Sequence, residues 1–192
     1  MAKIKKIKGR QVFDSRGNPT IEAEVYSDNG NHALAIIPSG ASTGTHEAFE
    51  LRDKENKNYL GKSVFKAVEN INGPIAKTLN NIDINDQTKI DKTLIDLDGT
   101  EQKKKLGANA ILAVSIASSK LAAIEKNTPL FKHLGNSKST QLPIPLLNII
   151  NGGVHAKNNL EIQEFMIRPE KVKSFSEAMR RSFLIIQNLK GM

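Results

Sequence analysis

The stretch that most constrains how this 192-residue chain can fold is "GANAILAVSIASSKLAAIEKN". Residues 108–124 within it are rich in alanine and nearly apolar all round, which predicts a helix buried on several sides, Leu112 included. Asn127, Thr128 and Pro129 predict where this helix ends. Such a helix needs other elements around it, and a chain of this length can supply them because it buries roughly 70% of its unfolded surface.

The first third of the chain predicts a three-stranded antiparallel sheet. Apolar and polar side chains alternate over residues 21–26, and this period of two is typical of a half-buried strand. Residues 4–14 form a first strand before it, and the turn "SDNGN" at 27–31 leads to a third strand over residues 32–37. Because the three segments follow one another closely, we expect a meander.

Helices are predicted for the middle of the chain. Apolar residues recur at helical spacing from Val64 to Ile71, and the pair Gly73-Pro74 is expected to interrupt that helix. The same spacing over residues 87–96 predicts another helix. A meander followed by helices places this part of the chain in the α+β class.

The pattern changes after the linker-like stretch "GNSKSTQLP", residues 135–143. Two apolar runs, 144–150 and 162–167, flank a glycine-bearing loop and predict two strands. A capping box from Ser174 to Glu177 predicts the start of a last helix. Two strands cannot bury their own faces, so this region either packs on the first part or begins a second domain.

Composition excludes several classes of protein. The chain is 39% hydrophobic and 25% charged, as soluble globular proteins are, and it has no cysteine for disulfides or a thiolate metal site. No run approaches roughly 18 uninterrupted apolar residues, and the basic N-terminus lacks the apolar segment of a secretory signal, so we expect a cytoplasmic protein without a membrane partner. The net charge of +8 invites nucleic-acid binding, but the lysines are scattered and aromatic residues are not interleaved with them. Solvated lysine faces are the expectation.

Two loops carry residue types suited to chemistry. "PSGASTG", residues 38–44, offers hydroxyls and glycine N–H groups that suit an anion, although such loops also serve as tight connections. Further on, His155 sits in a loop, and Gln163 and Glu164 lie in an otherwise apolar strand, where a carboxylate is costly unless it is paired. The histidines lack metal-ligand spacing and no Walker sequence is present. The residues alone indicate a polar site with a His/Gln/Glu set.

Five segments, taken in order, resemble one family, enolase (phosphopyruvate hydratase): "DSRGNPTIEAEV", "PSGASTGTHEAFELRD", "LDGTEQKKKLGANAILAVSIA", "PLLNIINGGVHAKNN" and "QEFMIRP". The resemblance runs from Ile4 to Lys190, essentially the whole chain. It implies an enolase-like N-terminal cap of a three-stranded antiparallel meander plus helices over residues 1–135. Residues 136–192 would then be the first β-β-α of an incomplete α/β barrel, so we expect a truncated chain.

The resemblance also assigns roles in the hydroxyl-rich loop. Gly40, Ala41, Ser42 and Thr43 match the lid that closes over 2-phosphoglycerate in this family. Ser42 matches a ligand of the second Mg²⁺ ion. Magnesium is therefore the cofactor that the resemblance implies, although its principal carboxylate ligands have no match in this chain.

Other residues match the family's substrate site and its dimer. His155 and Glu164 match active-site residues near the phosphate and hydroxyl end of the substrate, and Gln163 matches a substrate-binding residue. Arg10 and Glu22 resemble residues that pair with the partner subunit's barrel domain, so a homo-oligomer, a dimer or larger, is expected. Family members are cytoplasmic and also occur at the cell surface or are secreted.

The implied activity is that of a Mg²⁺-dependent lyase, which reversibly dehydrates 2-phospho-D-glycerate to phosphoenolpyruvate in glycolysis. That reaction removes a weakly acidic proton beside a carboxylate and needs magnesium, a base lysine and an acid glutamate. The family's motifs for these groups do not occur here, so the 192-residue chain is expected to be inactive alone, with Glu164 as an auxiliary residue. Two alternatives stay open: a non-catalytic binding or scaffold module built on the cap, and a basic protein that binds nucleic acid or a receptor.

Overall fold

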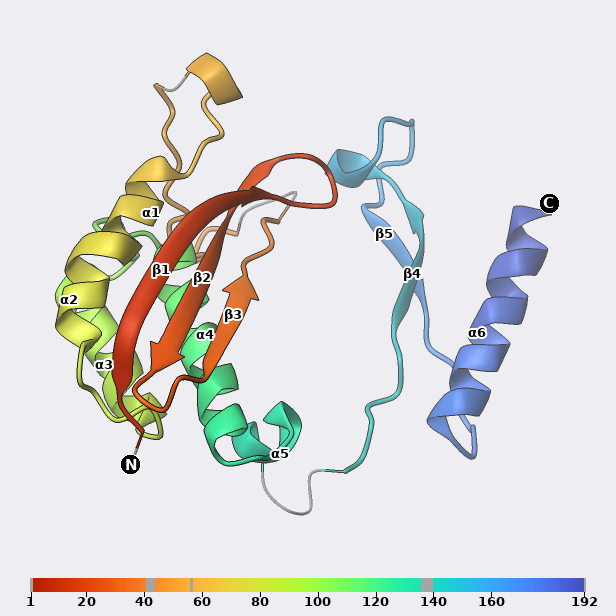
Figure 1. Ribbon diagram of the computed structural model, residues 1–192. Coiled ribbons are helices and arrows are strands. Elements are labelled where there is room, and N and C mark those ends of the chain that lie inside the picture. Colours follow the sequence, from red (N-terminus) through yellow and green to blue (C-terminus); the bar gives the residue numbers. More distant parts are fainter. Residues whose placement is uncertain (1, 41–43, 56, 136–139, 192) are drawn as a thin grey trace. The chain divides into compact units, whose positions relative to one another are not determined.

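The computed structural model describes residues 2–40, 44–55, 57–135 and 140–191, and the chain divides into two units (Figure 1). The first contains residues 2–39, 44–55 and 57–135, and the second contains residues 140–191 together with Gly40. Each unit has its own sheet, of three strands in the first and two in the second.

The first unit is an antiparallel meander with helices packed against it (Figure 1). Its strands lie in the order β1 (Ile4–Phe13), β2 (Pro19–Ser27) and β3 (His32–Ile36). Its helical elements are η1 (Lys57–Tyr59), α1 (Phe65–Asn70), η2 (Ile71–Ile75), α2 (Ala76–Leu79), α3 (Gln87–Asp98), α4 (Ala108–Glu125) and α5 (Leu130–Leu134). The predicted α+β meander with helices is confirmed.

Helix α4 lies against β2 and β3 and forms the centre of the core. Its alanines let it approach the sheet closely, and Leu121 is fully buried there. The prediction for Leu112 was wrong: this side chain is 48% exposed, because one side of the helix faces away from the core. Among the described residues α4 is also the one helix long and apolar enough to cross a membrane, but 56% of it is buried, as in the core helix of a soluble protein.

The predicted interruption at Gly73-Pro74 was also wrong. The helix continues from α1 to α2 through η2, a π-helical turn that contains Pro74. This wider turn places Asn72 against β1, where its side chain accepts from the Gly9 N–H (2.8 Å) and donates to the Gly9 carbonyl (3.0 Å). A Cβ at Gly9 would lie 2.9 Å from the Ile71 side chain, so only glycine allows this contact.

Strand β2 is covered on both faces, unlike the half-buried strand that its alternation predicts. Glu22 and Glu24 point away from α4, yet they are only 9% and 8% exposed. The Arg10 guanidinium pairs with both, and its Nε lies 3.0 Å from the Glu22 carboxylate. A hydrogen bond from Tyr26, together with Arg10, lowers the pKa of Glu24. Charge pairing therefore covers the second face of this strand.

A carboxylate at the end of α4 ties the helix to the β2–β3 turn. Glu125 accepts hydrogen bonds from the Ser27 hydroxyl (2.5 Å), the Asn29 amide (2.8 Å) and the Asn31 amide (3.1 Å). These bonds, that of Ser27 first, lower the pKa of Glu125. The turn is thus fixed by a residue from another element.

The second unit consists of a strand pair and one helix: β4 (Leu147–Asn151), η3 (Gly153–His155), β5 (Glu164–Ile167) and α6 (Phe175–Lys190). Its strands are antiparallel and shorter than the predicted runs 144–150 and 162–167. Among the described residues of this unit the buried apolar side chains are Pro169 and Ala178, whereas Phe165, Met166 and Phe183 are exposed. The unit therefore has no hydrophobic core of its own.

The predicted capping box at the start of α6 is half formed. Ser174 Oγ accepts the N–H of Glu177 at 3.2 Å, as expected. The Glu177 carboxylate binds Arg180 and Arg181 instead, at 2.8 Å each. These two guanidinium groups lower the pKa of Glu177 to about 2.

Candidate functional site

The connection between β4 and β5 is closed by backbone hydrogen bonds. The Gly152 N–H donates to the Gln163 carbonyl (2.9 Å), and the Gly153 N–H donates to the Leu160 carbonyl (2.7 Å). A Cβ at Gly152 would lie 2.4 Å from the Ile162 carbonyl oxygen, and Gly153 has a φ of +52°. Gly152 is therefore required for the close approach of the two chain segments, and Gly153 for the left-handed backbone of this loop.

His155, Gln163 and Glu164 come together in this loop. His155 Nδ1 lies 2.9 Å from Glu164 Oε1, and His155 Nε2 lies 2.9 Å from the Gln163 amide nitrogen. Neighbouring residues of a strand point to opposite faces, but β5 begins at Glu164, so Gln163 precedes the strand and reaches the same ring. The carboxylate of Glu164 is thus paired, and the side chains of His155 and Glu164 remain 20% and 29% exposed.

The hydroxyl-rich loop is described only at its ends. Gly40 is exposed, and the hydroxyl of its neighbour Ser39 donates to the Glu50 carboxylate at 3.0 Å. The remaining predicted lid and metal residues lie outside the described residues: Ala41, Ser42 and Thr43. Their predicted roles therefore stay predictions.

The described residues do not by themselves fit a magnesium ion. Within residues 2–40, 44–55, 57–135 and 140–191, no three His, Asp or Glu side chains gather closely enough to hold a metal. Glu164 is engaged by His155, and Ser42 would offer one neutral oxygen where Mg²⁺ prefers carboxylates and phosphates. A complete site would need ligands from elsewhere.

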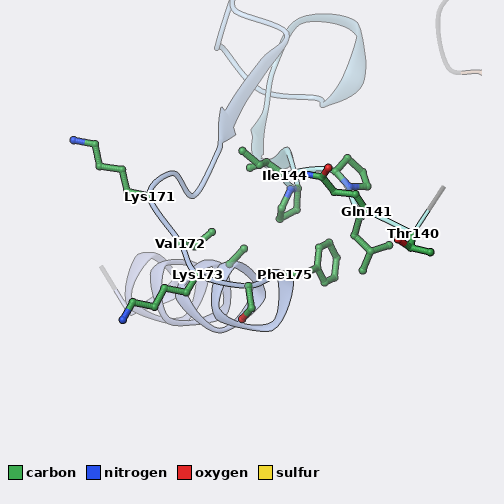
Figure 2. A pocket seen from close by; sticks show the side chains of 12 residues that line it. Thr140, Gln141, Ile144, Lys171, Val172, Lys173 and Phe175 are labelled. Carbon is green, nitrogen blue, oxygen red and sulfur yellow. The ribbon is translucent and has the colours of Figure 1, made fainter. Parts of the chain in front are cut away.

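A cavity of about 450 Å³ in the second unit lies apart from this cluster. It is formed by residues 140–145 and by the chain that leads into α6 (Figure 2). The side chains of Lys171 and Lys173 extend away from it, and its walls combine apolar side chains such as Ile144 and Phe175 with polar ones such as Gln141. His155, Gln163 and Glu164 do not line it. The cavity is therefore not part of the polar site.

Three asparagines that no sequence pattern singled out brace the loop. The Asn158 amide donates to the Asn151 carbonyl (2.9 Å), and its own oxygen accepts the Leu160 N–H (3.1 Å). The Asn148 amide donates to Asn151 Oδ1 at 2.5 Å. A signal was present, because asparagine commonly bonds nearby backbone in turns, and several asparagines flank the glycines here.

Comparison with known proteins covers both units. A family model described as "Enolase, N-terminal domain" matches residues 4–134, and one described as "Enolase, C-terminal TIM barrel domain" matches residues 139–192. An enolase of Pelagibacter ubique (strain HTCC1062) is 64% identical over 192 residues, which are 100% of this chain and 46% of that protein. The chain thus spans about half the length of the curated relative it matches, and the resemblance predicted from the five motifs is confirmed. On these grounds the chain belongs to the enolase family.

Proposed function

We propose that this chain is part of an enolase that carries out the Mg²⁺-dependent, reversible dehydration of 2-phospho-D-glycerate to phosphoenolpyruvate in glycolysis. The observation that supports this most directly is the cluster of His155, Gln163 and Glu164 on the β4–β5 connection. It combines a histidine, an amide and a carboxylate at an accessible place, in a chain 64% identical to an enolase. Cytoplasmic location is part of the proposal.

The residues of this chain would bind and orient the substrate. His155 and Gln163 present polar groups to it, and Glu164 acts as an auxiliary residue by holding the His155 ring at Nδ1. The loop of Gly40, Ala41 and Ser42 would cover the substrate, and Ser42 would give the metal one oxygen. When bound, magnesium supplies electrostatic stabilisation of the enediolate. Because the base lysine and acid glutamate have no match here, we expect the 192-residue chain alone to be inactive.

We also propose that the whole protein is a homo-oligomer with Arg10 and Glu22 at the subunit contact. In the structure these two residues pair with one another within the chain. Arg10 Nε is buried and makes no well-aligned hydrogen bond among the described residues, despite its 3.0 Å distance to Glu22. The rest of the Arg10 side chain is accessible, since the side chain is 42% exposed, so an acceptor on a partner subunit can reach it, which supports the proposal.

A chimera tests the proposed activity. These 192 residues are joined to the part of the Pelagibacter ubique enolase that follows its matching region, and phosphoenolpyruvate formation is followed by absorbance with magnesium present. We expect turnover in the chimera and none in the 192-residue chain. Ser42→Ala and Glu164→Gln should each lower kcat of the chimera by roughly a hundredfold or more.

The matched control is Glu161→Gln, which removes an exposed carboxylate from the same connection and should leave kcat unchanged. A chimera that folds, binds magnesium and shows no turnover would contradict the proposal. It would favour the alternative of a non-catalytic binding module built on the cap.

A further inference from the structure

Both ring nitrogens of His155 have a hydrogen-bonding partner on the β4–β5 connection. Glu164 Oε1, 2.9 Å from Nδ1, is a carboxylate oxygen and can only accept. The Gln163 amide nitrogen, 2.9 Å from Nε2, can only donate. One form of the ring satisfies both contacts: a neutral imidazole that carries its hydrogen on Nδ1 and a lone pair on Nε2.

We propose that Glu164 and Gln163 together hold His155 in this one neutral form, and that Gln163 is a positioning residue whose N–H covers Nε2 until a ligand replaces it. The inference deepens the proposed function and rests on it only for the identity of the ligand. It gives Gln163 a role that acts through His155 and is separate from direct contact with substrate.

The backbone holds the Gln163 side chain at this place. Its carbonyl accepts the Gly152 N–H at 2.9 Å, one residue before β5 begins. The Glu164 side chain, as the first residue of β5, approaches the ring at its other nitrogen. Ring, amide and carboxylate therefore lie on one short connection, and a ligand can reach them without opening a core.

The neutral form selects the chemistry of the group that replaces Gln163. A lone pair at Nε2 accepts from a donor, such as a substrate hydroxyl or a water molecule. An anionic oxygen cannot take this place unless Nε2 first binds a proton from solvent. In that case the Gln163 N–H contact breaks, and the amide must turn over to present its oxygen. In this ring form Nε2 therefore accepts from a donor, whether the donor belongs to the substrate or to water.

Nuclear magnetic resonance tests the form of the ring directly. The chain is labelled with ¹⁵N-histidine. Long-range proton–nitrogen spectra are recorded at a pH at which a free imidazole is neutral, both for the 192-residue chain and for the chimera. We expect Nδ1 of His155 to give the shift of a protonated nitrogen and Nε2 that of an unprotonated one. The exposed His46 is the internal reference.

Three variants separate the two partners. Gln163→Met removes the donor, so Nδ1 should stay protonated while the Nε2 signal moves. Gln163→Glu places an acceptor at each nitrogen, so the Nε2 signal should move toward that of a protonated nitrogen. Glu164→Gln should weaken the preference for hydrogen on Nδ1, because an amide can donate as well as accept.

The control Glu161→Gln should leave the His155 signals unchanged. A ring protonated on Nε2 in the unaltered chain would overturn the inference. So would His155 signals that stay the same in both Gln163 variants while the amide signals of Ile150 and Phe165, recorded on uniformly ¹⁵N-labelled samples of the same variants, show the strand pair intact. Where the isolated chain does not form the pair, the chimera gives the deciding spectra. These spectra do not depend on enzyme activity. A chimera that is inactive but shows the expected ring form would therefore count against the proposed function alone.

Discussion

Replacing two leucines of α4 by alanine tests how this helix is buried. Leu121 is fully buried between the helix and the sheet, whereas Leu112 is 48% exposed. Leu121→Ala removes three buried carbons at about 0.8 kcal/mol each, roughly 2.4 kcal/mol, and the cavity left behind raises the loss to about 3–5 kcal/mol. Leu112→Ala removes carbons that are only half buried and leaves no closed cavity, so we expect a loss of about 1 kcal/mol or less.

Tyrosine fluorescence during urea unfolding measures this difference in the first unit alone. The chain has no tryptophan, and both of its tyrosines, Tyr26 and Tyr59, lie in that unit. With a slope of about 1–3 kcal/mol per molar urea, Leu121→Ala should lower the midpoint by about 1–5 M. Leu112→Ala should lower it by a third of that or less at the same slope. Equal shifts for the two variants would refute the burial argument.

Three further outcomes are expected. Gly152→Ala puts a Cβ 2.4 Å from a carbonyl oxygen, so hydrogen exchange should show that the amides of the β4–β5 pair lose protection. Gly73→Ala meets no atom within 4 Å, so the first unit should stay as stable or become about 0.4–1 kcal/mol more stable. Equal effects of the two variants would contradict this. The Ser27 hydroxyl lowers the pKa of Glu125 below 4.5. The ionised Glu125 carboxylate therefore contributes to stability above pH 4.5, and this contribution is lost as the pH falls through the lowered pKa. Urea curves should therefore fall more steeply with acid in the unaltered chain than in Glu125→Gln, and parallel curves would argue against the bond. Limited proteolysis should cut near residues 135–141 and leave a soluble first unit, because the second has no apolar core; a second unit of equal resistance would contradict this.

The sequence alone determined the elements that depend on local pattern. The alternation over residues 21–26, the "SDNGN" turn and the apolar run of α4 each predict their element, because strand and helix periods are properties of neighbouring residues. The sequence also predicted the family, since five segments resemble it in order. The pairing of Glu164 also followed from sequence in general terms, because an unpaired carboxylate in an apolar strand is costly.

Only the tertiary structure decided which side of each element is buried and which partners meet. Leu112 faces away from the core although the whole helix is apolar, and Arg10 covers carboxylates on a face that the pattern assigns to solvent. Asn72 contacts Gly9, 63 positions away in the sequence, from a π turn in a helix that Pro74 was expected to interrupt. Contacts of this kind join residues far apart in the chain, and a period of two or 3.6 carries no information about them. The ring form of His155 is set in the same way, by partners that the folded β4–β5 connection brings to each nitrogen.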